Sequence, residues 1–376
     1  MKYKMIELGT LITQAKTVRC GESNYPVLSM TMHDGLVLQD DRFKKAIASK
    51  DKSDYKVVYR DQLVISFPID EGVLATQRIT DAGIVSPAYG IWDVDQEKMV
   101  PEFLEYALRC ERSIAYYKAK LRGSTARRRT LPTPTLLAHT VPLPSIEEQK
   151  YILDLIHKIE TVIHLRKDEL RKLDELIKAR FIEMFGNPIT NSKGWDIVEL
   201  AELTDIGSSK RIFEKEYVSE GIPFYRTKEI VELAKGNSVS TELFITEERF
   251  TEIKEKYGAP KTGDLLISAV GTIGVIWIVD GKNDFYFKDG NLIRVDGTEK
   301  FNSVYMKNLL EYLIDGYKKQ MSTGTAYAAL TISGLAKMKV YDIPMELQNQ
   351  FADFVHQVNK SKLLKARQAV FIAKIR

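Results

Sequence analysis

The chain has 376 residues, of which 44% are hydrophobic and 28% charged, and its formal net charge is +4 at pH 7. A single core stops growing beyond about 250–300 residues, so this length predicts two or three domains. The sequence lacks a run of about 18 uncharged apolar residues and an apolar N-terminal leader, which excludes a membrane-spanning class. Cys20 and Cys110 are the only cysteines. They indicate a reducing compartment such as the cytoplasm and form no metal-ligand pattern.

Residues 1–143 predict a mixed α+β segment with largely antiparallel strands. Strand-like runs occur at 57–59 and 63–66, flanked by charges and turn residues. A helix is predicted over 101–121, because Pro101 suits a first turn and apolar residues then recur at helical spacing.

A basic cluster lies at the end of this segment, opposed only by Glu111. Its members are Arg109, Arg112, Lys118, Lys120, Arg122, Arg127, Arg128 and Arg129. A glycine turn at 123–125 adds two hydroxyl side chains that could donate to phosphate, while arginine suits bidentate contacts to guanine and phosphate. The cluster can be read as a nucleic-acid contact or simply as a solvated basic face.

A long helix is predicted next. Ser145 and Glu148 form a capping-box pattern at its start, and Gly-Asn-Pro at 186–188 stops it. Between them, apolar residues follow a 4-3 spacing that breaks only at Arg166 and Arg180, which is typical of a coiled-coil strand. These seam residues are Ile152, Ile156, Ile159, Ile163, Leu170, Leu173, Ile177 and Met184. About 40 helical residues make a rod of roughly 60 Å.

Residues 191–343 predict a second mixed α+β segment. Strand-like runs fall at 264–270, 274–279, 285–287 and 292–295, followed by a helix over about 303–319. This segment carries 20 Lys/Arg and 23 Asp/Glu, so its overall charge does not favour nucleic acid. Any such function has to depend on local clusters.

The second half repeats the first. The sequence Val-Pro-Leu-Pro-Ser-Ile-Glu-Glu-Gln at 141–149 aligns with Val-Tyr-Asp-Ile-Pro-Met-Glu-Leu-Gln at 340–348. Upstream, Leu-Val-Ile-Ser at 63–66 aligns with Leu-Leu-Ile-Ser at 265–268. A repeat of about 200 residues is longer than the 20–50 residues of solenoid units. It indicates a duplicated pair of a globular unit plus a long helix.

The final segment, 344–376, predicts a second and weaker rod. Its seam is Phe351, Val355, Val358, Lys362, Lys365, Ala369, Ile372 and Arg376. A lone amphipathic helix would leave its stripe in water, so the two rods are predicted to pack antiparallel, as scaffold and as a ruler between two similar surfaces.

Motifs of common chemistries are missing from the sequence. It contains no Gly-x4-Gly-Lys-Ser/Thr, His-Glu-x-x-His, Cys-x-x-Cys pair or Gly-x-Ser-x-Gly, and its five histidines are scattered. This favours a binding protein over an enzyme, with no catalytic residue and no metal site assigned.

Candidate turns recur at matched positions of the two globular segments with different residues, as expected of an interchangeable reading head. The candidates for contacts to DNA are Lys120, Arg122, Ser124, Thr125, Arg127, Arg128, Arg129, Arg226, Thr227, Lys228, Ser268, Thr272, Lys288, Asn291, Thr325 and Tyr327. Each turn taken alone also fits an ordinary surface turn.

In this order of elements the chain resembles a specificity subunit of a type I restriction–modification system. The resemblance rests on Pro-Leu-Pro-Ser-Ile-Glu-Glu-Gln at 142–149, Phe-Gly-Asn-Pro at 185–188 and Ile-Pro-Met-Glu-Leu-Gln-Asn-Gln-Phe at 343–351. The short distal helix departs from the family pattern and leaves open how completely the rods pair.

The resemblance implies an α+β fold with two duplicated target-recognition domains, 1–143 and 191–343, and two long antiparallel helices, 144–190 and 344–376, in a pseudo-twofold coiled coil. It also implies a bipartite site in double-stranded DNA, two methyltransferase subunits and motor-nuclease subunits. S-adenosylmethionine, ATP and Mg²⁺ are expected in those partners, and no cofactor is expected on this chain. A protein–protein scaffold that touches no nucleic acid, and an unrecognised nuclease, are the alternatives.

Overall fold

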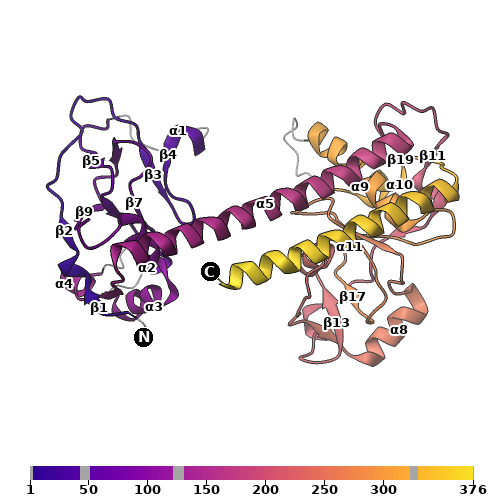
Figure 1. The fold of residues 1–376 in the computed structure, drawn as a ribbon. Coiled ribbons are helices and arrows are strands. Elements are labelled where there is room, and N and C mark those ends of the chain that lie inside the picture. The colour runs from indigo at the N-terminus through magenta and orange to yellow at the C-terminus, as the bar shows by residue number, and fades with distance from the viewer. Residues whose placement is uncertain (1–2, 43–50, 122–130, 322–328, 376) are drawn as a thin grey trace. The chain divides into compact units, whose positions relative to one another are not determined.

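The computed structural model describes residues 3–42, 51–121, 131–321 and 329–375 (Figure 1). The chain divides into two compact units, Met1–Val162 and Ile163–Ile375. The boundary falls inside one helix, α5 (Ile146–Phe185), which begins in the first unit and ends in the second. None of the helices in the described ranges combines the length and hydropathy required to cross a bilayer.

The first unit is built from short strands and short helices, as its alternating apolar runs and turns predict. Its elements are β1 (Met5–Glu7), β2 (Ile12–Gln14), β3 (Leu28–Thr31), β4 (Gly35–Leu38), α1 (Gln39–Arg42), β5 (Lys56–Tyr59), β6 (Leu63–Ile65), β7 (Leu74–Thr76), β8 (Ala82–Val85), β9 (Gly90–Val94), α2 (Pro101–Arg109), α3 (Glu111–Lys120), α4 (Thr133–Leu137) and β10 (Thr140–Pro142), with short 3-10 turns at Leu8–Thr10 and Ile69–Glu71.

The main sheet of the first unit has the strand order β2-β9-β6-β7, and every pairing in it is antiparallel. Trp92 of β9 lies opposite both Gln14 of β2 and Leu63 of β6. The core between this sheet and helices α2 and α3 contains the buried residues Leu8, Leu63, Leu74, Trp92, Phe103, Leu104, Leu108 and Tyr117. Because this core joins the sheet to the two helices, it fixes the positions of the loops at the ends of the strands.

The helix predicted over 101–121 is two helices, broken at Cys110, so the single-helix prediction is wrong. Cys110 has an extended backbone, with φ −68° and ψ 159°. Side chains of α3 then bond carbonyls that the end of α2 leaves without helical partners. Ser113 Oγ donates to the Ala107 carbonyl at 2.7 Å, and Tyr117 Oη donates to the Leu108 carbonyl at 3.1 Å. These side-chain caps offset the cost of the break.

The second unit contains the rest of α5, the second globular segment and the final helix. Its elements are β11 (Ile197–Glu199), α6 (Leu200–Leu203), β12 (Ile206–Gly207), β13 (Ile222–Tyr225), α7 (Thr227–Ala234), β14 (Phe244–Ile245), α8 (Glu247–Tyr257), β15 (Leu265–Ser268), β16 (Ile276–Ile278), β17 (Tyr286–Phe287), β18 (Leu292–Val295), α9 (Ser303–Met321), α10 (Ile332–Ala336), β19 (Lys339–Tyr341) and α11 (Met345–Ile375), with a 3-10 turn at Glu214–Glu216.

The second unit repeats the strand order of the first, which confirms the predicted duplication of the fold. Its main sheet runs β12-β18-β15-β16, and β11 pairs with β19 as β1 pairs with β10. The match extends to single contacts. A Cβ added to Gly72 would lie 3.3 Å from Ile114 Cδ1, and one added to Gly274 would lie 2.6 Å from Ile314 Cγ2. Both glycines have positive φ, 75° and 80°.

Helices α5 and α11 pack antiparallel within the second unit, as predicted (Figure 1). Near the end of α5, Phe185 stacks edge-on against Phe351 with ring centroids 5.5 Å apart. Nearer the middle of α5, Glu169 accepts a hydrogen bond from Lys365 at 3.0 Å. Later residues of α11 therefore meet earlier residues of α5. Buried Ile177, Phe181, Phe185, Phe351, Val355 and Val358 join this pair to the core beneath it.

The seam predicted for α11 is its covered face over the residues whose side chains are described. Phe351, Val355 and Val358 are buried. The two lysines at the following seam positions are half-buried, and each pairs with an acidic residue of α5. Lys362 contacts Asp174, and Lys365 contacts Glu169. Polar seam positions fix the register of a helix pair at some cost in stability.

Candidate nucleic-acid interface

In the second unit, several strand ends meet along one side of the sheets. Strand β13 runs parallel to β17, with Tyr225 opposite Phe287, so both strands end on this side. The Lys288 N–H donates to the Tyr225 carbonyl at 2.9 Å just beyond the paired residues. Arg226 and Lys228, at the start of α7, therefore lie next to the turn at 288–291. The shared strand direction brings together two predicted segments that are 60 residues apart.

A third predicted segment joins the same side through β15 and β18. Ser268, the last residue of β15, lies opposite Leu292, the first of β18. The Ala269 N–H donates to the Asn291 carbonyl at 2.8 Å, and the Leu330 N–H donates to the Ala269 carbonyl at 3.0 Å. The loop at 268–275 thus neighbours both the 288–291 turn and the chain that returns from α9.

A fourth segment of this side was not predicted from the sequence. Strand β12 is antiparallel to β18, with Gly207 opposite Arg294, so it delivers residues 208–211 to the same side. Ser208 Oγ donates to the Leu292 carbonyl at 3.1 Å. The Ser-Ser-Lys-Arg run directly after a short strand could have indicated this segment. The four segments 208–211, 226–228, 268–275 and 288–291 are called the unit-2 edge below.

Ser268 has a structural position within this edge. Its side chain is fully buried, and its hydroxyl donates to the Thr272 carbonyl while accepting from the Val275 N–H at 2.9 Å. The hydroxyl is therefore used inside the loop, which corrects the prediction that Ser268 contacts DNA. Thr272, at the exposed tip that these bonds shape, remains a surface candidate.

Arg226 is held by a carboxylate of its own helix. Its Nη2 donates to Glu229 Oε1 at 2.9 Å and its N–H donates to Glu229 Oε2 at 2.9 Å. Burial alone would raise the pKa of Glu229, but the hydrogen bonds from Arg226 outweigh it and lower that pKa. The Arg226 charge is partly neutralised as a result. Lys228 is exposed beside it, and Thr227 Oγ1 is buried without a partner among the described residues.

The basic cluster of the first unit is only partly a surface feature. Arg109 donates through Nη2 to the Met32 carbonyl at 3.0 Å and through Nη1 to Glu105 at 3.2 Å. Arg112 donates to Thr140 Oγ1 at 2.8 Å. These two arginines support the fold, whereas Lys120 is exposed at the end of α3.

Several predicted contact residues lie outside the described residues. They are Arg122, Ser124, Thr125, Arg127, Arg128, Arg129, Thr325 and Tyr327. Among the predicted residues that the structure describes, Arg226, Thr227, Lys228, Thr272, Lys288 and Asn291 come together at the unit-2 edge.

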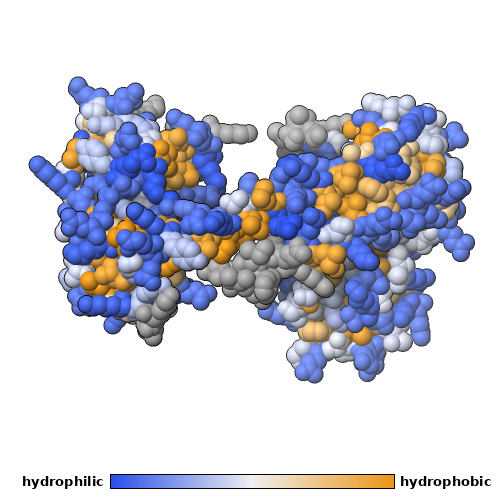
Figure 2. Space-filling view, viewed as in Figure 1, coloured by the Kyte–Doolittle hydropathy of each residue, from blue (hydrophilic) through white to orange (hydrophobic). Residues whose placement is uncertain are grey.

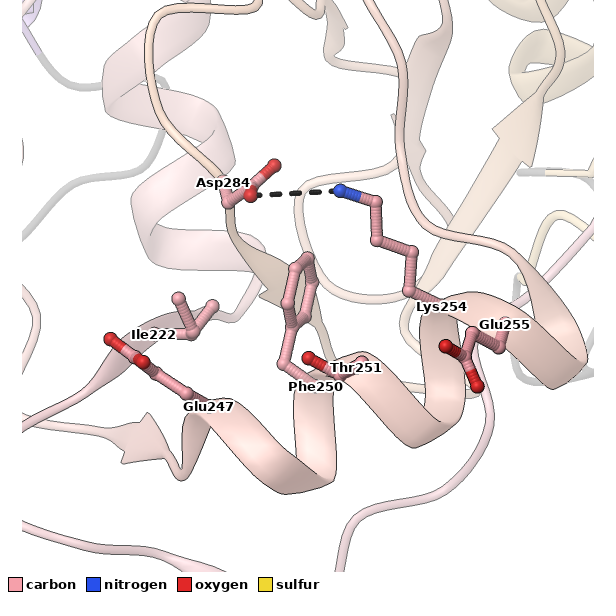
Figure 3. A pocket seen from close by; sticks show the side chains of 7 residues that line it. All are labelled: Ile222, Glu247, Phe250, Thr251, Lys254, Glu255 and Asp284. Atoms are coloured by element: carbon pink, nitrogen blue, oxygen red, sulfur yellow. Dashed lines mark ion pairs between the residues drawn. The ribbon is translucent and has the colours of Figure 1, made fainter.

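A surface hollow of about 580 Å³ lies elsewhere on the second unit (Figure 3). Ile222 and Phe250 contribute apolar side chains to it, and Lys254 pairs across it with Asp284 at 3.6 Å. Ile222 begins β13 and Asp284 precedes β17, so the hollow lies at the opposite ends of the strands that reach the unit-2 edge. Its remaining charged residues, Glu247 and Glu255, are acidic and unsuited to an anionic ligand.

The described residues offer no cluster of three or more His, Cys, Asp or Glu side chains arranged to hold a metal ion. The arrangement that they do offer is a duplicated α+β unit, each copy followed by a long helix, with basic and hydroxyl side chains on loops at one side of the second copy. Loops on a rigid sheet are where proteins commonly place their binding residues.

Comparison with known proteins agrees with this arrangement. Residues 192–370 match the family described as type I restriction modification DNA specificity domain. A putative type I restriction enzyme specificity subunit of Haemophilus influenzae is 27% identical over 265 residues, covering 69% of this chain and 64% of that protein. The type I restriction enzyme MjaIX specificity subunit of Methanocaldococcus jannaschii is 24% identical over 312 residues, covering 75% and 68%.

Two solved structures share the fold over almost the whole chain. One, from work on complex assembly and conformational transition of the type I R-M system, has a TM-score of 0.60 at 18% identity and covers 99% of this chain and 95% of its own. The type I system S subunit from M. genitalium has a TM-score of 0.52 at 13% identity and covers 100% and 94%. The predicted fold class is thereby confirmed.

Residues 192–370 of this chain thus match the type I restriction modification DNA specificity domain, and 69–75% of the chain is similar in sequence to type I specificity subunits. The resemblance predicted from the sequence is confirmed.

Proposed function

We propose that this chain is the non-catalytic DNA sequence-recognition subunit of a type I restriction–modification enzyme. The recognition domains, residues 1–143 and 191–343, each read one half of a split target in double-stranded DNA. The helices within 144–190 and 344–376 set the unread spacer between the halves. The family match of residues 192–370 to a DNA specificity domain supports this proposal directly.

The observation that carries the proposal is the repetition of one scaffold with different loop residues. Both units have the same order in the main sheet, and each has a glycine of positive φ packed on an isoleucine of a helix that follows the sheet, Ile114 of α3 or Ile314 of α9. The matching loops differ in sequence, with Phe67, Pro68, Ile69 and Asp70 in the first unit where the second has Ala269, Val270, Gly271 and Thr272. A constant scaffold with variable tips suits two readers of two sequences. Because each wrong base contact costs about 1–3 kcal/mol, two half-sites multiply their discrimination.

Partner subunits supply the chemistry in this proposal. Two methyltransferase subunits methylate adenine with S-adenosylmethionine, and motor-nuclease subunits use ATP and Mg²⁺, all in the cytoplasm. Exposed apolar residues on α5 outside its predicted seam support docking of such partners, and Figure 2 shows apolar surface along this helix. They are Tyr151, Leu155, Val162, Leu165 and Leu176. These residues fall on the 4-3 spacing typical of helix-to-helix contacts, which Lys158, Glu169 and Lys172 interrupt.

Exchange of one recognition domain tests the division of labour. Residues 191–343 are replaced by the equivalent segment of another specificity subunit, and the complex is assembled with its methyltransferase partners. Sequencing of methylated adenines in the host genome should then show one half of the target changed and the other half and the spacer retained. A change in both halves would contradict the proposal.

Salt dependence separates DNA reading from a pure protein scaffold. Binding of the complex to duplex DNA should weaken linearly with the logarithm of salt concentration, because protein cations displace counterions. Replacing Arg127, Arg128 and Arg129 together by alanine should weaken binding and flatten that slope. An unchanged affinity and slope would show that these arginines do not contact DNA. If the unaltered complex showed no salt-dependent binding, the protein–protein scaffold would be favoured.

A further inference from the structure

Four basic side chains lie in the segments 208–211 and 226–228 of the unit-2 edge. Their environments differ. Arg226 has its guanidinium paired twice with Glu229, at 2.9 and 3.4 Å. Lys210 places its ammonium over the Tyr257 ring, 5.2 Å from the centroid. Lys228 is exposed. Arg211 alone combines a mostly exposed side chain with a single anchoring bond from its Nε, to Asp289.

We propose that Arg211 is a specificity-determining residue, which contacts a guanine of the second half-site and is held in position by Asp289. The proposal rests on the proposed function and goes beyond it, because it assigns a residue outside the predicted contacts to one base. It follows from three features of the 208–211 segment: its anchored backbone, the way Arg211 is paired, and its place in the edge.

The backbone that carries Arg211 is anchored to the sheet on both sides. The Lys210 N–H donates to Tyr286 Oη at 2.7 Å, and the Tyr286 ring is buried. Ser208 Oγ donates to the Leu292 carbonyl at 3.1 Å and accepts from the Gly290 N–H at 3.4 Å. Ile212, directly after Arg211, is buried in a hydrophobic cluster. A side chain on such a backbone loses little conformational entropy when it binds.

The pairing with Asp289 orients the guanidinium and leaves its far side open. Arg211 Nε donates to Asp289 Oδ2 at 2.7 Å. The Asp289 side chain is 17% exposed and that of Arg211 is 66% exposed, so the carboxylate is the fixed partner. Bonding through Nε leaves the two terminal nitrogens for another acceptor pair. Two parallel donors of this kind match the O6 and N7 acceptors that guanine presents in the major groove.

The position in the edge places Arg211 beside residues suited to the backbone of DNA. Asp289 belongs to the 288–291 turn, whose Lys288 is bonded to the end of β13 just before Lys228. An exposed lysine contacts phosphate as a point charge and fixes the register of a protein on the duplex. If Lys228 contacts phosphate and Arg211 contacts a base, their variants should differ. Loss of Lys228 should weaken binding to all sequences alike, whereas loss of Arg211 should change the sequence preference.

The experiment uses the complex of the full-length chain with its methyltransferase partners. Binding and methylation are measured over duplexes whose second half-site is randomised, and the products are sequenced. Arg211→Ala should reduce the preference for guanine at one position of the second half-site by about 5- to 150-fold, and leave the first half-site unchanged. Arg211→Lys keeps the charge but not the two parallel donors, so it should keep most of the affinity and lose the same preference.

Two further variants separate the base contact from other roles. Lys228→Ala should weaken binding about equally for all sequences and reduce the slope against salt by about one. Asp289→Asn keeps the size of the side chain and removes its charge, so it should relax the same guanine position as Arg211→Ala by a smaller factor. Thermal unfolding of each variant checks that the fold is retained.

Arg60→Ala is the matched control. Arg60 also donates through Nε to an aspartate, Asp81, at 3.1 Å, but it lies in the turn before β6, at the strand end opposite to the loop at 66–73. It should leave every base preference unchanged. A retained guanine preference in Arg211→Ala, or a uniform loss across sequences, would overturn the inference while leaving the proposed function intact. A wild-type complex that shows no bipartite sequence preference would overturn both.

Discussion

Gln149 and Gln348 share two matching contacts in the two halves of the chain. Gln149 Oε1 accepts from the Val100 N–H at 2.8 Å, and its Nε2 donates to the Pro144 carbonyl at 3.0 Å. Gln348 Oε1 accepts from the Asn302 N–H at 2.8 Å, and its Nε2 donates to the Ile343 carbonyl at 2.7 Å. Both side chains are buried. Each amide thereby joins the start of a long helix to the start of the helix that lies on the sheet.

Replacing either glutamine by leucine should destabilise its unit. The substitution leaves a buried N–H and a buried carbonyl without partners, at a cost of about 2–4 kcal/mol. Denaturant unfolding of Gln149→Leu and Gln348→Leu measures this loss. Gln357→Leu, at an exposed position of α11, is the control and should change stability little. Equal stabilities for all three variants would show that the clamps contribute nothing.

The lysines in the α11 seam should limit the stability of the helix pair. Lys362 and Lys365 occupy positions that are apolar in a stronger coiled coil, and both are half-buried against α5. Lys362→Leu should raise the melting temperature of the second unit by roughly 2–4 °C, because an apolar seam residue packs better than a paired charge. Lys360→Leu, on the exposed face, should have no such effect. A lower melting temperature for Lys362→Leu would mean that the ion pair with Asp174 outweighs the packing.

The first unit should lose stability as the pH falls below about 6.5. Burial of His139, together with repulsion from Arg112, lowers its pKa to about 4 from the ordinary value of 6.5. Between these values the unfolded chain binds a proton that the folded chain does not, so stability is complete above pH 6.5 and falls as the pH decreases. The loss amounts to something on the order of 3 kcal/mol.

Urea unfolding at pH 7.5 and pH 5 tests this dependence. His139→Phe keeps an aromatic ring beside Tyr116, whose ring centroid is 4.5 Å from that of His139, and removes the titrating group. The difference in stability between the two pH values should shrink in this variant. His356→Phe, at an exposed site, should retain the wild-type difference. The same pH dependence in wild type and His139→Phe would assign the effect to other groups.

Gly274 and Gly271 should respond differently to alanine. Both have positive φ, which disfavours alanine by about 1–2 kcal/mol. A Cβ at Gly274 would also meet Ile314 Cγ2 at 2.6 Å, whereas one at Gly271 meets nothing within 4 Å. Gly274→Ala should therefore destabilise the second unit by about 1–3 kcal/mol more than Gly271→Ala, measured by denaturant unfolding. Equal losses would mean that α9 shifts without cost.

Much of the fold follows from local sequence patterns. The internal repeat predicted two like units, and the 4-3 spacing predicted both long helices and the covered face of α11. The contacts of α5 with α11 include Phe181, Phe185 and Glu169, which lie outside its predicted seam. The match of Gln149 with Gln348 was visible in the aligned repeat. The structure gives its reason, because both amides are buried and hydrogen-bonded at equivalent places. The break at Cys110 was not predictable in the same way, since it depends on hydroxyls of Ser113 and Tyr117 that reach back across the turn.

The candidate interface was less predictable, because its geometry depends on pairings between distant residues. The sequence placed the Ser268 hydroxyl at the surface, but in the structure the loop encloses it. Arg226 looked available, but a glutamate three residues later holds it. Arg211 was not singled out, because its partner Asp289 is far away in the sequence and the two meet only through the strand order β12-β18.

In the loop at 268–275, the residues that hold the loop in shape differ from the residue that is exposed at its tip. Ser268 and Gly274 maintain its architecture from the inside, whereas Thr272 contributes its backbone carbonyl to the bond with Ser268 and is exposed. Residue choice at the tip can consequently drift or be engineered at little thermodynamic penalty, so new target preferences should be easier to obtain at position 272 than at its neighbours.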